Sequence, residues 1–396
     1  MRLLRRTVTA VALVFGAPGL LMAQDSPTDP NAPPIDPDNP VQIDVDNTGY
    51  GTVSGEFLQF GASARGMALG GAVSTIVDDV SALHYNPANL VFMPGPQATL
   101  TVMPYFAETD YYWAGVALPL SNNDFGFGAF LGRFGFSDQP IYTEADEQGA
   151  AGTTYSVNEV VAGLSFAHAF IDRFSAGGTV KYVTDDLATG ALSGAKASTV
   201  TFDFGVNFHS ELWDRPVALA FVVQNLGGSL GHSGGALRFR DFNASGTDPS
   251  VPDQNIDPPY AEYSTDAFPL PRLFRFGLNY DVISGDAVRL SVLGEFVESN
   301  NQGPQFGFGG EFGWQSVDSP IGAWLRGSYT TQPDNEDLGS AGDYIDASDT
   351  GLDGLAFGGG LYYKIADSYR LQFDYAYRHF GALGSTDAFT FTIGWE

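Results

Sequence analysis

The sequence predicts an all-β membrane protein: an antiparallel outer-membrane β-barrel of about fourteen strands, with a small N-terminal helical hatch in the lumen. Three observations lead to this prediction. The chain is rich in aromatic residues (14%) and in glycine (49 residues) but only 16% charged, whereas soluble domains are about 25% charged. Apolar and polar residues alternate along most of the chain, and short and long links separate the alternating segments. Such features are typical of strands that face lipid on one side and water on the other.

The overall composition excludes several functions. The 396 residues carry a formal net charge of -28, and nucleic-acid binding requires a basic surface, so we expect no nucleic-acid partner. The chain has no cysteine, which rules out disulfides and thiolate metal sites. Its histidines form no H-x-x-x-H or H-E-x-x-H pair. We therefore expect no metal site, no cofactor and no enzymatic activity.

The N-terminal 50 residues are predicted to lie outside the folded barrel. Residues 1–23 are interpreted as a signal peptide, because Arg2, Arg5 and Arg6 precede an apolar stretch that ends near Ala23. An uncleaved anchor is the alternative, although the stretch is shorter than the ~20 residues that span a bilayer as a helix. Residues 24–50 are rich in Pro and Asp, which predicts a disordered linker.

Residues 51–95 are predicted to form the hatch. Ala, Gly and Ser dominate this segment, and its apolar residues recur at helical spacing only in short pieces. The Asn86-Pro87 step should end any helix there, because the residue before a proline disfavours the helical conformation. The segment is too short for a domain and too rich in small residues for a stable free helix, so we interpret it as a plug.

Residues 96–396 are predicted to form the transmembrane barrel. Large apolar side chains alternate with polar ones, as in the run Tyr369, Arg370, Leu371, Gln372, and this alternation indicates an amphipathic strand. Most of the alternating segments run ~9–13 residues, close to the length that a tilted strand needs to cross a bilayer. The predicted strands are residues 97–106, 111–119, 124–134, 155–170, 173–184, 198–209, 215–226, 272–282, 287–298, 304–314, 320–330, 352–364, 368–380 and 387–395.

The links between these segments alternate in length. Every long link, at 135–154, 185–197, 227–271 and 331–351, follows an odd-numbered segment, and the links after even-numbered segments are short. This parity is typical of short periplasmic turns and long extracellular loops. We therefore expect a location in the cell outer membrane, with both termini periplasmic and the long loops extracellular. Outer-membrane lipid and the barrel-assembly machinery are then expected partners.

The long links carry much of the acidic charge. Residues 135–154 and 331–351 contain several Asp and Glu but no Lys or Arg. A solvated external rim is the favoured interpretation, and a divalent-cation site is the alternative.

Two overlapping G-x-S-x-G matches place Ser229 and Ser233 in a glycine-rich link. In a serine hydrolase this motif joins the end of a buried strand to the start of a helix, and no helical pattern follows here. A surface serine hydrolase is therefore the least favoured hypothesis. Gly126, Gly128 and Gly132 lie within a predicted strand and are spaced like packing glycines rather than a phosphate cradle.

Eight polar side chains lie on the face opposite the apolar one and are predicted to point into the lumen, because a charge that faces lipid at mid-membrane costs about 2–4 kcal/mol. Their mixed signs suggest a paired ladder that holds the plug in place. Polar packing that simply fills the barrel and a selective ion path are the other interpretations. The eight residues are Lys181, Asp203, Asn207, Arg289, Glu295, Gln372, Asp374 and Arg378.

Residues 56–90 resemble the N-terminal segment of the PorV/PorQ family, within the wider FadL-like class (long-chain fatty acid transporter type) of outer-membrane barrels. The resemblance rests on FLQFGASARGMALGGA and on the later stretches VVQNLGG and PLPRLFRFGLNY. The chain departs from the usual barrel-assembly signal, which ends on an aromatic residue, because Glu396 follows Trp395. The matching hatch residues are Arg65, Asp78, Asp79, Ser81, Asn86, Pro87 and Ala88.

This resemblance implies a fourteen-stranded barrel closed by a hatch, and it leaves two functions open. PorV-like members serve type IX secretion, which would make this chain a surface or secretion-associated component with secretion-system partners. FadL-like members carry hydrophobic molecules inward across the outer membrane. The channel hypothesis predicts an apolar pocket of about 300–1,000 Å³ beside the hatch, so the lumen beside Asn86–Ala88 is the place to distinguish the two.

Overall fold

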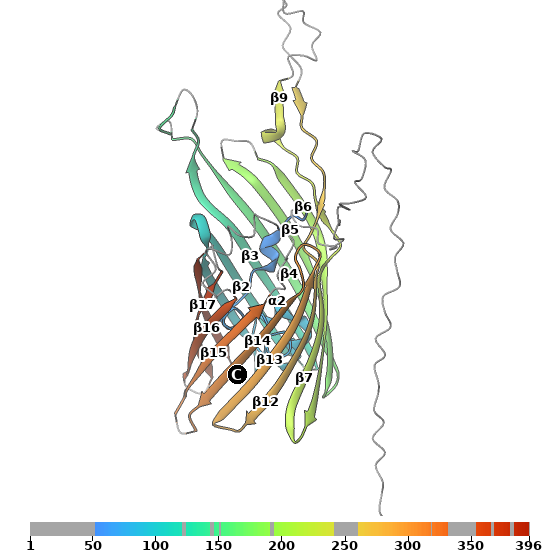
Figure 1. The fold of residues 1–396 in the computed structure, drawn as a ribbon, viewed down its shortest axis with the longest axis vertical. Helices are drawn as coiled ribbons and strands as arrows, with labels where there is room; N and C mark the ends of the chain where they lie inside the picture. Colours follow the sequence, from blue (N-terminus) through green and yellow to red (C-terminus); the bar gives the residue numbers. More distant parts are fainter. Residues whose placement is uncertain are drawn as a thin grey trace, which may run out of the picture. The chain divides into compact units, whose positions relative to one another are not determined.

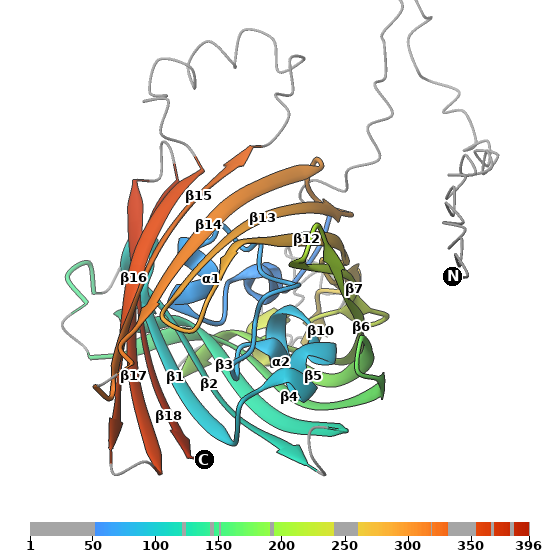
Figure 2. The same cartoon turned by 90° about the horizontal axis from the view of Figure 1, so that it is seen from below.

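The computed structural model describes residues 52–395 except 121–123, 143–145, 150–151, 191–193, 241–259, 318, 332–353, 366–367 and 381–383. Fourteen antiparallel strands close into a barrel (Figures 1 and 2), which confirms the predicted fold class. Each strand pairs with its neighbours along the chain, and the first pairs with the last. The strands are β1 (Gln97–Pro104), β2 (Thr109–Leu120), β3 (Phe125–Pro140), β4 (Thr154–Ile171), β5 (Phe174–Gly190), β6 (Lys196–Leu212), β7 (Arg215–Leu226), β12 (Leu273–Ser284), β13 (Val288–Ser299), β14 (Gln305–Gln315), β15 (Ile321–Thr331), β16 (Leu355–Ile365), β17 (Tyr369–His379) and β18 (Ser385–Trp395).

The two faces of the wall follow the predicted alternation. On β17, Tyr369 and Leu371 are 53% and 44% exposed on the outer face, while Asp374 and Ala376 point inward and are buried. The other strands repeat this pattern, so large apolar side chains cover the outside of the barrel. A continuous exposed apolar surface of this kind is unfavourable in water and is suited to lipid hydrocarbon.

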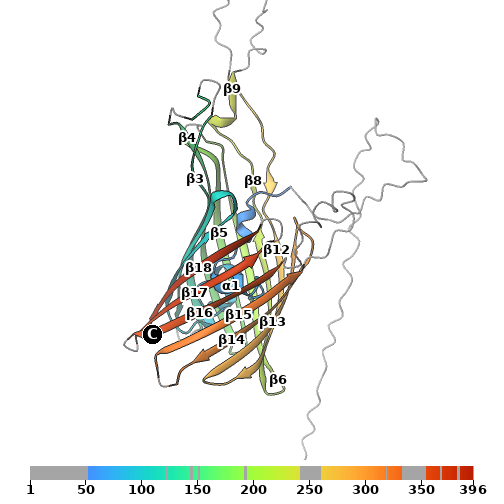
Figure 3. The same cartoon turned by 60° about the vertical axis from the view of Figure 1, so that its left-hand side comes forward.

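Four neighbouring strands are longer than predicted. β3, β4, β5 and β6 contain 16, 18, 17 and 17 residues, and Figure 3 shows β3 and β4 continuing past the barrel strands β14 to β18. In the extra length polar residues face each other, as in the pairs Ser156–Thr189 and Asn158–Asp186. In these strands the alternation of apolar and polar residues therefore ends before the backbone hydrogen bonds between the strands end. The predicted long link 185–197 is wrong for this reason, because only residues 191–195 separate β5 from β6.

The link between β7 and β12 contains regular structure that the sequence pattern did not predict. It forms two small two-stranded sheets, one of β8 (Ser229–Leu230) with β11 (Phe268–Pro269) and one of β9 (Arg238–Arg240) with β10 (Tyr260–Glu262). A short 3-10 helix, η4 (Gly235–Leu237), precedes β9, and another, η3 (Phe106–Glu108), joins β1 to β2.

The segment before β1 folds inside the ring of strands (Figure 2). It contains η1 (Glu56–Gln59), α1 (Ala64–Ala68), α2 (Ala82–Tyr85) and η2 (Pro87–Phe92). In the described part of the chain, no helix is both long enough and apolar enough to cross a membrane. The main cluster of buried apolar side chains lies between this hatch and the wall.

Some predictions fall outside the described residues. The signal peptide at 1–23, the linker at 24–50, nearly all of the acidic link 331–351 and Glu396 belong to this group. They stay predictions.

Candidate functional site: the hatch and its seat

Short polar caps define the two halves of the hatch. The Ser63 hydroxyl accepts a hydrogen bond from Gly66 N at 3.1 Å and caps α1. Asn86 caps η2 in the same way, accepting from Ala88 N at 3.1 Å, and Pro87 occupies the first position of η2. Proline suits that position because its missing N–H would have no helical partner there. The predicted stop at Asn86-Pro87 is thus also the start of the next helical turn.

Glycines of the wall form a seat for the hatch. A Cβ added at Gly177 of β5 would lie 2.6 Å from the carbonyl carbon of Pro87, and one at Gly126 of β3 would lie 2.5 Å from the Leu90 Cβ. Real atoms do not approach so closely, so only glycine allows the hatch backbone to rest against the strand. The same holds where the hatch meets the inward-facing glycines Gly115, Gly128, Gly205, Gly277 and Gly358.

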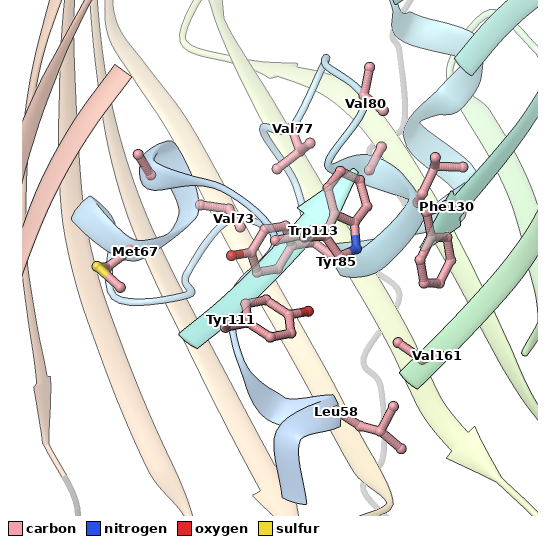
Figure 4. Close-up of a cluster of buried hydrophobic side chains, with 14 of the residues drawn as sticks. Leu58, Met67, Val73, Val77, Val80, Tyr85, Tyr111, Trp113, Phe130 and Val161 are labelled. Atoms are coloured by element: carbon pink, nitrogen blue, oxygen red, sulfur yellow. The ribbon is translucent and has the colours of Figure 1, made fainter. Parts of the chain in front are cut away.

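The side of the hatch that faces β2, β3 and β4 packs through apolar side chains (Figure 4). Trp113 of β2 is fully buried and stacks on Phe130 of β3 with ring centroids 5.7 Å apart. Tyr85, Val80 and the wall side chains complete this cluster. Burial of such aromatic side chains is a large stabilising term, so this side anchors the hatch.

The opposite side of the hatch is held by charges, and Arg65 is central to them. Its guanidinium pairs with Asp78 at 2.5 Å and Asp79 at 3.1 Å within the hatch. It also forms two hydrogen bonds of 2.9 Å with Glu311 of β14. Glu311 in turn accepts from Arg326 of β15 at 2.7 Å, and Arg326 Nη1 lies 2.5 Å from Asp374 of β17. The hatch motif is thereby joined to three wall strands.

A second network centres on Arg275 of β12. Its guanidinium pairs with Glu295 of β13 at 2.9 Å and donates to Gln224 of β7 at 2.8 Å. Glu295 accepts a hydrogen bond from Ser74 N at 3.0 Å, and Gln224 donates to the His84 carbonyl. Both wall partners of Arg275 therefore reach the hatch backbone.

The structure brings some of the eight predicted lumen residues to the hatch but not others. Asn207 donates to the Thr75 carbonyl at 3.1 Å, and Glu295 and Asp374 belong to the two networks above. Gln372 supports Asp374 through a hydrogen bond of 2.7 Å. The other four predicted residues make their contacts outside the hatch: Lys181 and Asp203 pair with each other at 2.7 Å, Arg289 pairs with Asp281 at 3.0 Å, and Arg378 lies over the Phe380 ring at 4.8 Å.

The sequence prediction missed four of the residues that bind the hatch: Gln224, Arg275, Glu311 and Arg326. The sequence does contain the alternation of apolar and polar residues at these positions, because Arg275 lies between Phe274 and Phe276 and Arg326 follows Leu325. The alternation rule that selected Arg289 would have placed them on the inward face as well.

Burial and charge shift the pKa values of several hatch side chains, among them His84 and Asp78. Burial lowers the pKa of His84 well below its ordinary value, and the positive charges of Lys181 and Arg275 lower it further. For Asp78, burial acts to raise the pKa, but the charge and hydrogen bond of Arg65 outweigh burial and lower it. The docked hatch thus holds a neutral histidine and a charged aspartate.

The lumen beside Asn86–Ala88 is filled by the contacts with Gly177 and Gly205. Among the described residues, two cavities lie on the two sides of α1. One cavity, the hatch pocket, has a volume of about 210 Å³, and the other, the network pocket beside Arg65 and Glu311, about 80 Å³. The apolar side chains of the hatch pocket are Phe60, Met67, Tyr85, Met103, Tyr105, Leu273, Val297 and Phe380.

The hatch pocket lies beside the hatch, where the channel hypothesis predicted an apolar pocket. It is smaller than the expected 300–1,000 Å³, and its lining mixes apolar side chains with polar and charged ones such as Gln302, Gln305 and Arg378. It lies where β1, β13 and β17 end, because Met103, Ser299 and Phe380 line it. This is the end of the barrel that carries the long links.

The serine motifs lack the geometry of a hydrolase. Ser229 lies in the two-residue strand β8, and Ser233 forms a backbone bridge with Lys196. His232 between them is hydrogen-bonded to Asp185 at 3.0 Å. Within the described residues no hydrogen bond joins either serine hydroxyl to His232, and no cluster of three or more His, Asp or Glu could hold a metal.

No protein-family model matches this chain, and no curated protein matches it. Solved structures do match it. A deltaS2S3 variant of the TodX monoaromatic hydrocarbon channel aligns with a TM-score of 0.51 at 13% identity, over 85% of this chain and 98% of that chain. A Pseudomonas aeruginosa FadL homologue aligns with a TM-score of 0.46 at 11% identity, over 84% of this chain and 98% of that one. The Ralstonia pickettii toluene transporter TbuX aligns with a TM-score of 0.48 at 12% identity, over 85% and 97%.

At this identity the TodX alignment establishes the fold alone. The chain is a closed fourteen-stranded barrel of FadL-like fold, and a hatch made from its own N-terminal segment fills the lumen.

Proposed function

We propose that this protein is an outer-membrane channel for small hydrophobic molecules, with the hatch pocket as its binding site. The observation that carries the proposal is the pocket of about 210 Å³ between the hatch and the wall, whose lining includes eight apolar side chains. Ligand sites are typically concave and combine apolar side chains with polar groups that fix the orientation of the ligand, and both kinds of side chain line this pocket. The FadL-like fold supports the proposal, since its neighbours are described as a hydrocarbon channel and toluene transporters.

The proposal includes an orientation. The long-link end faces the cell exterior and both termini face the periplasm, so the hatch pocket opens toward the medium. Outer-membrane lipid surrounds the apolar wall, and the barrel-assembly machinery inserts it. A secretion-associated role of PorV/PorQ type rests on the hatch motif and the acidic external loops, and we prefer the channel function because the pocket supports it.

The experiment is uptake of a labelled monoaromatic hydrocarbon by liposomes that contain the purified protein. Leu273 lines the pocket and is 4% exposed, whereas Leu278 lies on the lipid face of the same strand and is 45% exposed. We expect Leu273→Trp to fill the pocket and abolish most uptake, and Leu278→Trp to leave it unchanged. Equal uptake by both variants, or no uptake above that of empty liposomes by the unmodified protein, would overturn the proposed function.

A further inference from the structure

Arg378 is a charged side chain in the hatch pocket without a charged partner in the described part of the chain. Its Nε is buried and donates no hydrogen bond to any of the described residues. The guanidinium lies 4.8 Å from the centre of the Phe380 ring and beside the pocket. An arginine stays protonated in proteins and offers five N–H donors, so Arg378 holds a positive charge that no acidic side chain of the described residues neutralises.

The rest of the pocket does not compensate this charge. The described residues that line it include no Asp or Glu. The other lining cation, Arg275, is already neutralised by Glu295 at 2.9 Å. The pocket therefore carries one net positive charge, although the whole chain has a net charge of -28. The Arg378 side chain is half-buried and its Nε is fully buried. An unpaired charge is costly to the extent that it is buried, and a ligand that supplies the counter-charge would reduce that cost.

We infer that the hatch pocket binds a compact organic monoanion, with a carboxylate on Arg378 and an apolar or aromatic body against Phe60, Met67 and Phe380. A carboxylate can accept two parallel N–H bonds from a guanidinium. The volume of about 210 Å³ lies below the usual range for drug-sized ligands, which favours a single-ring acid over a long acyl chain. This inference rests on the proposed function and specifies the charge of its substrate.

The chain offers a matched control on the same strand. Arg370 lies eight residues before Arg378 on the inward face of β17 and also has a buried Nε without a hydrogen-bond partner among the described residues. It lines the network pocket on the other side of α1 and lies over the Tyr362 ring at 4.3 Å. Replacing it removes the same charge without touching the hatch pocket.

The test measures binding of 4-methylbenzoate and of 4-nitrotoluene, its uncharged isostere, by titration calorimetry with the purified full-length protein in detergent. We expect Arg378→Gln to weaken 4-methylbenzoate binding about 10- to 100-fold, as loss of a charged hydrogen bond predicts. Binding of 4-nitrotoluene should change little. Arg378→Lys should retain part of the affinity for the anion, and Arg370→Gln should bind both compounds like the unmodified protein. Circular dichroism verifies that each variant is folded.

The inference is overturned if Arg378→Gln binds 4-methylbenzoate as tightly as the unmodified protein, if Arg370→Gln weakens it equally, or if the unmodified protein does not bind the anion. The measurement with 4-nitrotoluene distinguishes failure of this inference from failure of the proposed channel function. One result would contradict only the inferred charge of the ligand: the unmodified protein binds 4-nitrotoluene but not 4-methylbenzoate, and Leu273→Trp prevents the binding of 4-nitrotoluene. The proposed channel function and its binding pocket would then still be supported.

Discussion

Arg65 of the hatch and Glu311 of β14 form a two-point ion pair, in which Nε donates to Oε2 and Nη2 donates to Oε1, each at 2.9 Å. Both side chains are almost completely buried. Parallel hydrogen bonds of this kind fix orientation as well as distance. The pair therefore determines the orientation of the hatch against the wall. We call the contacts of Arg65 with Glu311 the polar latch.

Breaking this ion pair should weaken the attachment of the hatch to the barrel wall. Glu311→Gln leaves Arg65 and Arg326 without a shared counter-charge, and loss of one partner of a buried ion pair costs about 3–5 kcal/mol. We expect higher ion conductance in planar bilayers and faster protease cleavage of the hatch. Glu298→Gln, which changes an exposed acid at the end of β13, serves as the control. Unchanged conductance in Glu311→Gln would show that the apolar side alone holds the hatch.

The glycine seat predicts a strong difference between two neighbouring substitutions on β5. Gly177→Ala would place a Cβ 2.6 Å from the Pro87 backbone, whereas the Cβ of Gly178→Ala would lie 3.4 Å from its nearest neighbour, the Asp203 carbonyl. Overpacking of this kind costs about 1–3 kcal/mol, and the backbone of the hatch has to move to relieve it. Hydrogen exchange of hatch amides should accelerate in Gly177→Ala only. Equal exchange rates of the hatch amides in the two variants would contradict the conclusion that Gly177 is required for the close contact between hatch and wall.

Acidification should weaken hatch docking through His84. Its pKa is lowered well below the ordinary value in the docked state by burial and by Lys181 and Arg275, so the released hatch binds a proton that the docked hatch excludes. Docking stability is then complete above pH ~6.5 and falls by up to about 1.4 kcal/mol per pH unit below it. Hydrogen exchange of hatch amides between pH 8 and pH 5, corrected for the intrinsic rate, measures this slope.

The matching variants separate His84 from other groups. His84→Gln should flatten the slope between pH 6.5 and pH 5, while His168→Gln, at the rim, should not. The lowered pKa of Asp78 adds a further loss of stability only below pH ~4, as that carboxylate is protonated. A slope that persists in His84→Gln would assign the pH dependence to another residue.

Asn86 should matter for the hatch more than its size suggests. Its side-chain amide donates to the Ser74 carbonyl at 2.9 Å, and its carbonyl oxygen caps η2. Asn86→Ala removes both interactions, and a lost cap costs about 0.5–2 kcal/mol. We expect faster hydrogen exchange at Ala88 and its neighbours with an unchanged barrel. Asn86→Asp keeps the cap but not the donor, so its effect should be intermediate. Equal exchange in all three proteins would contradict the role of this side chain.

The sequence alone was sufficient for the barrel wall. All fourteen strands and their inward and outward faces follow from alternation with a period of two residues, because neighbouring side chains of a strand point to opposite faces. The plug and its break at Asn86-Pro87 follow from local rules as well. Where β3 to β6 continue beyond the apolar band, the local signal ends and the predicted links were too long.

Tertiary structure alone decided which polar side chains meet. Arg65 and Glu311 are 246 residues apart in the chain, and no local pattern relates two positions so distant. The fit of Pro87 against Gly177 and the position of Arg378, which has no acidic partner among the described residues, likewise depend on how the hatch folds back into the closed ring. A period of two residues assigns a side chain to the lumen, but its partner there depends on strand register, barrel closure and the three-dimensional path of the hatch.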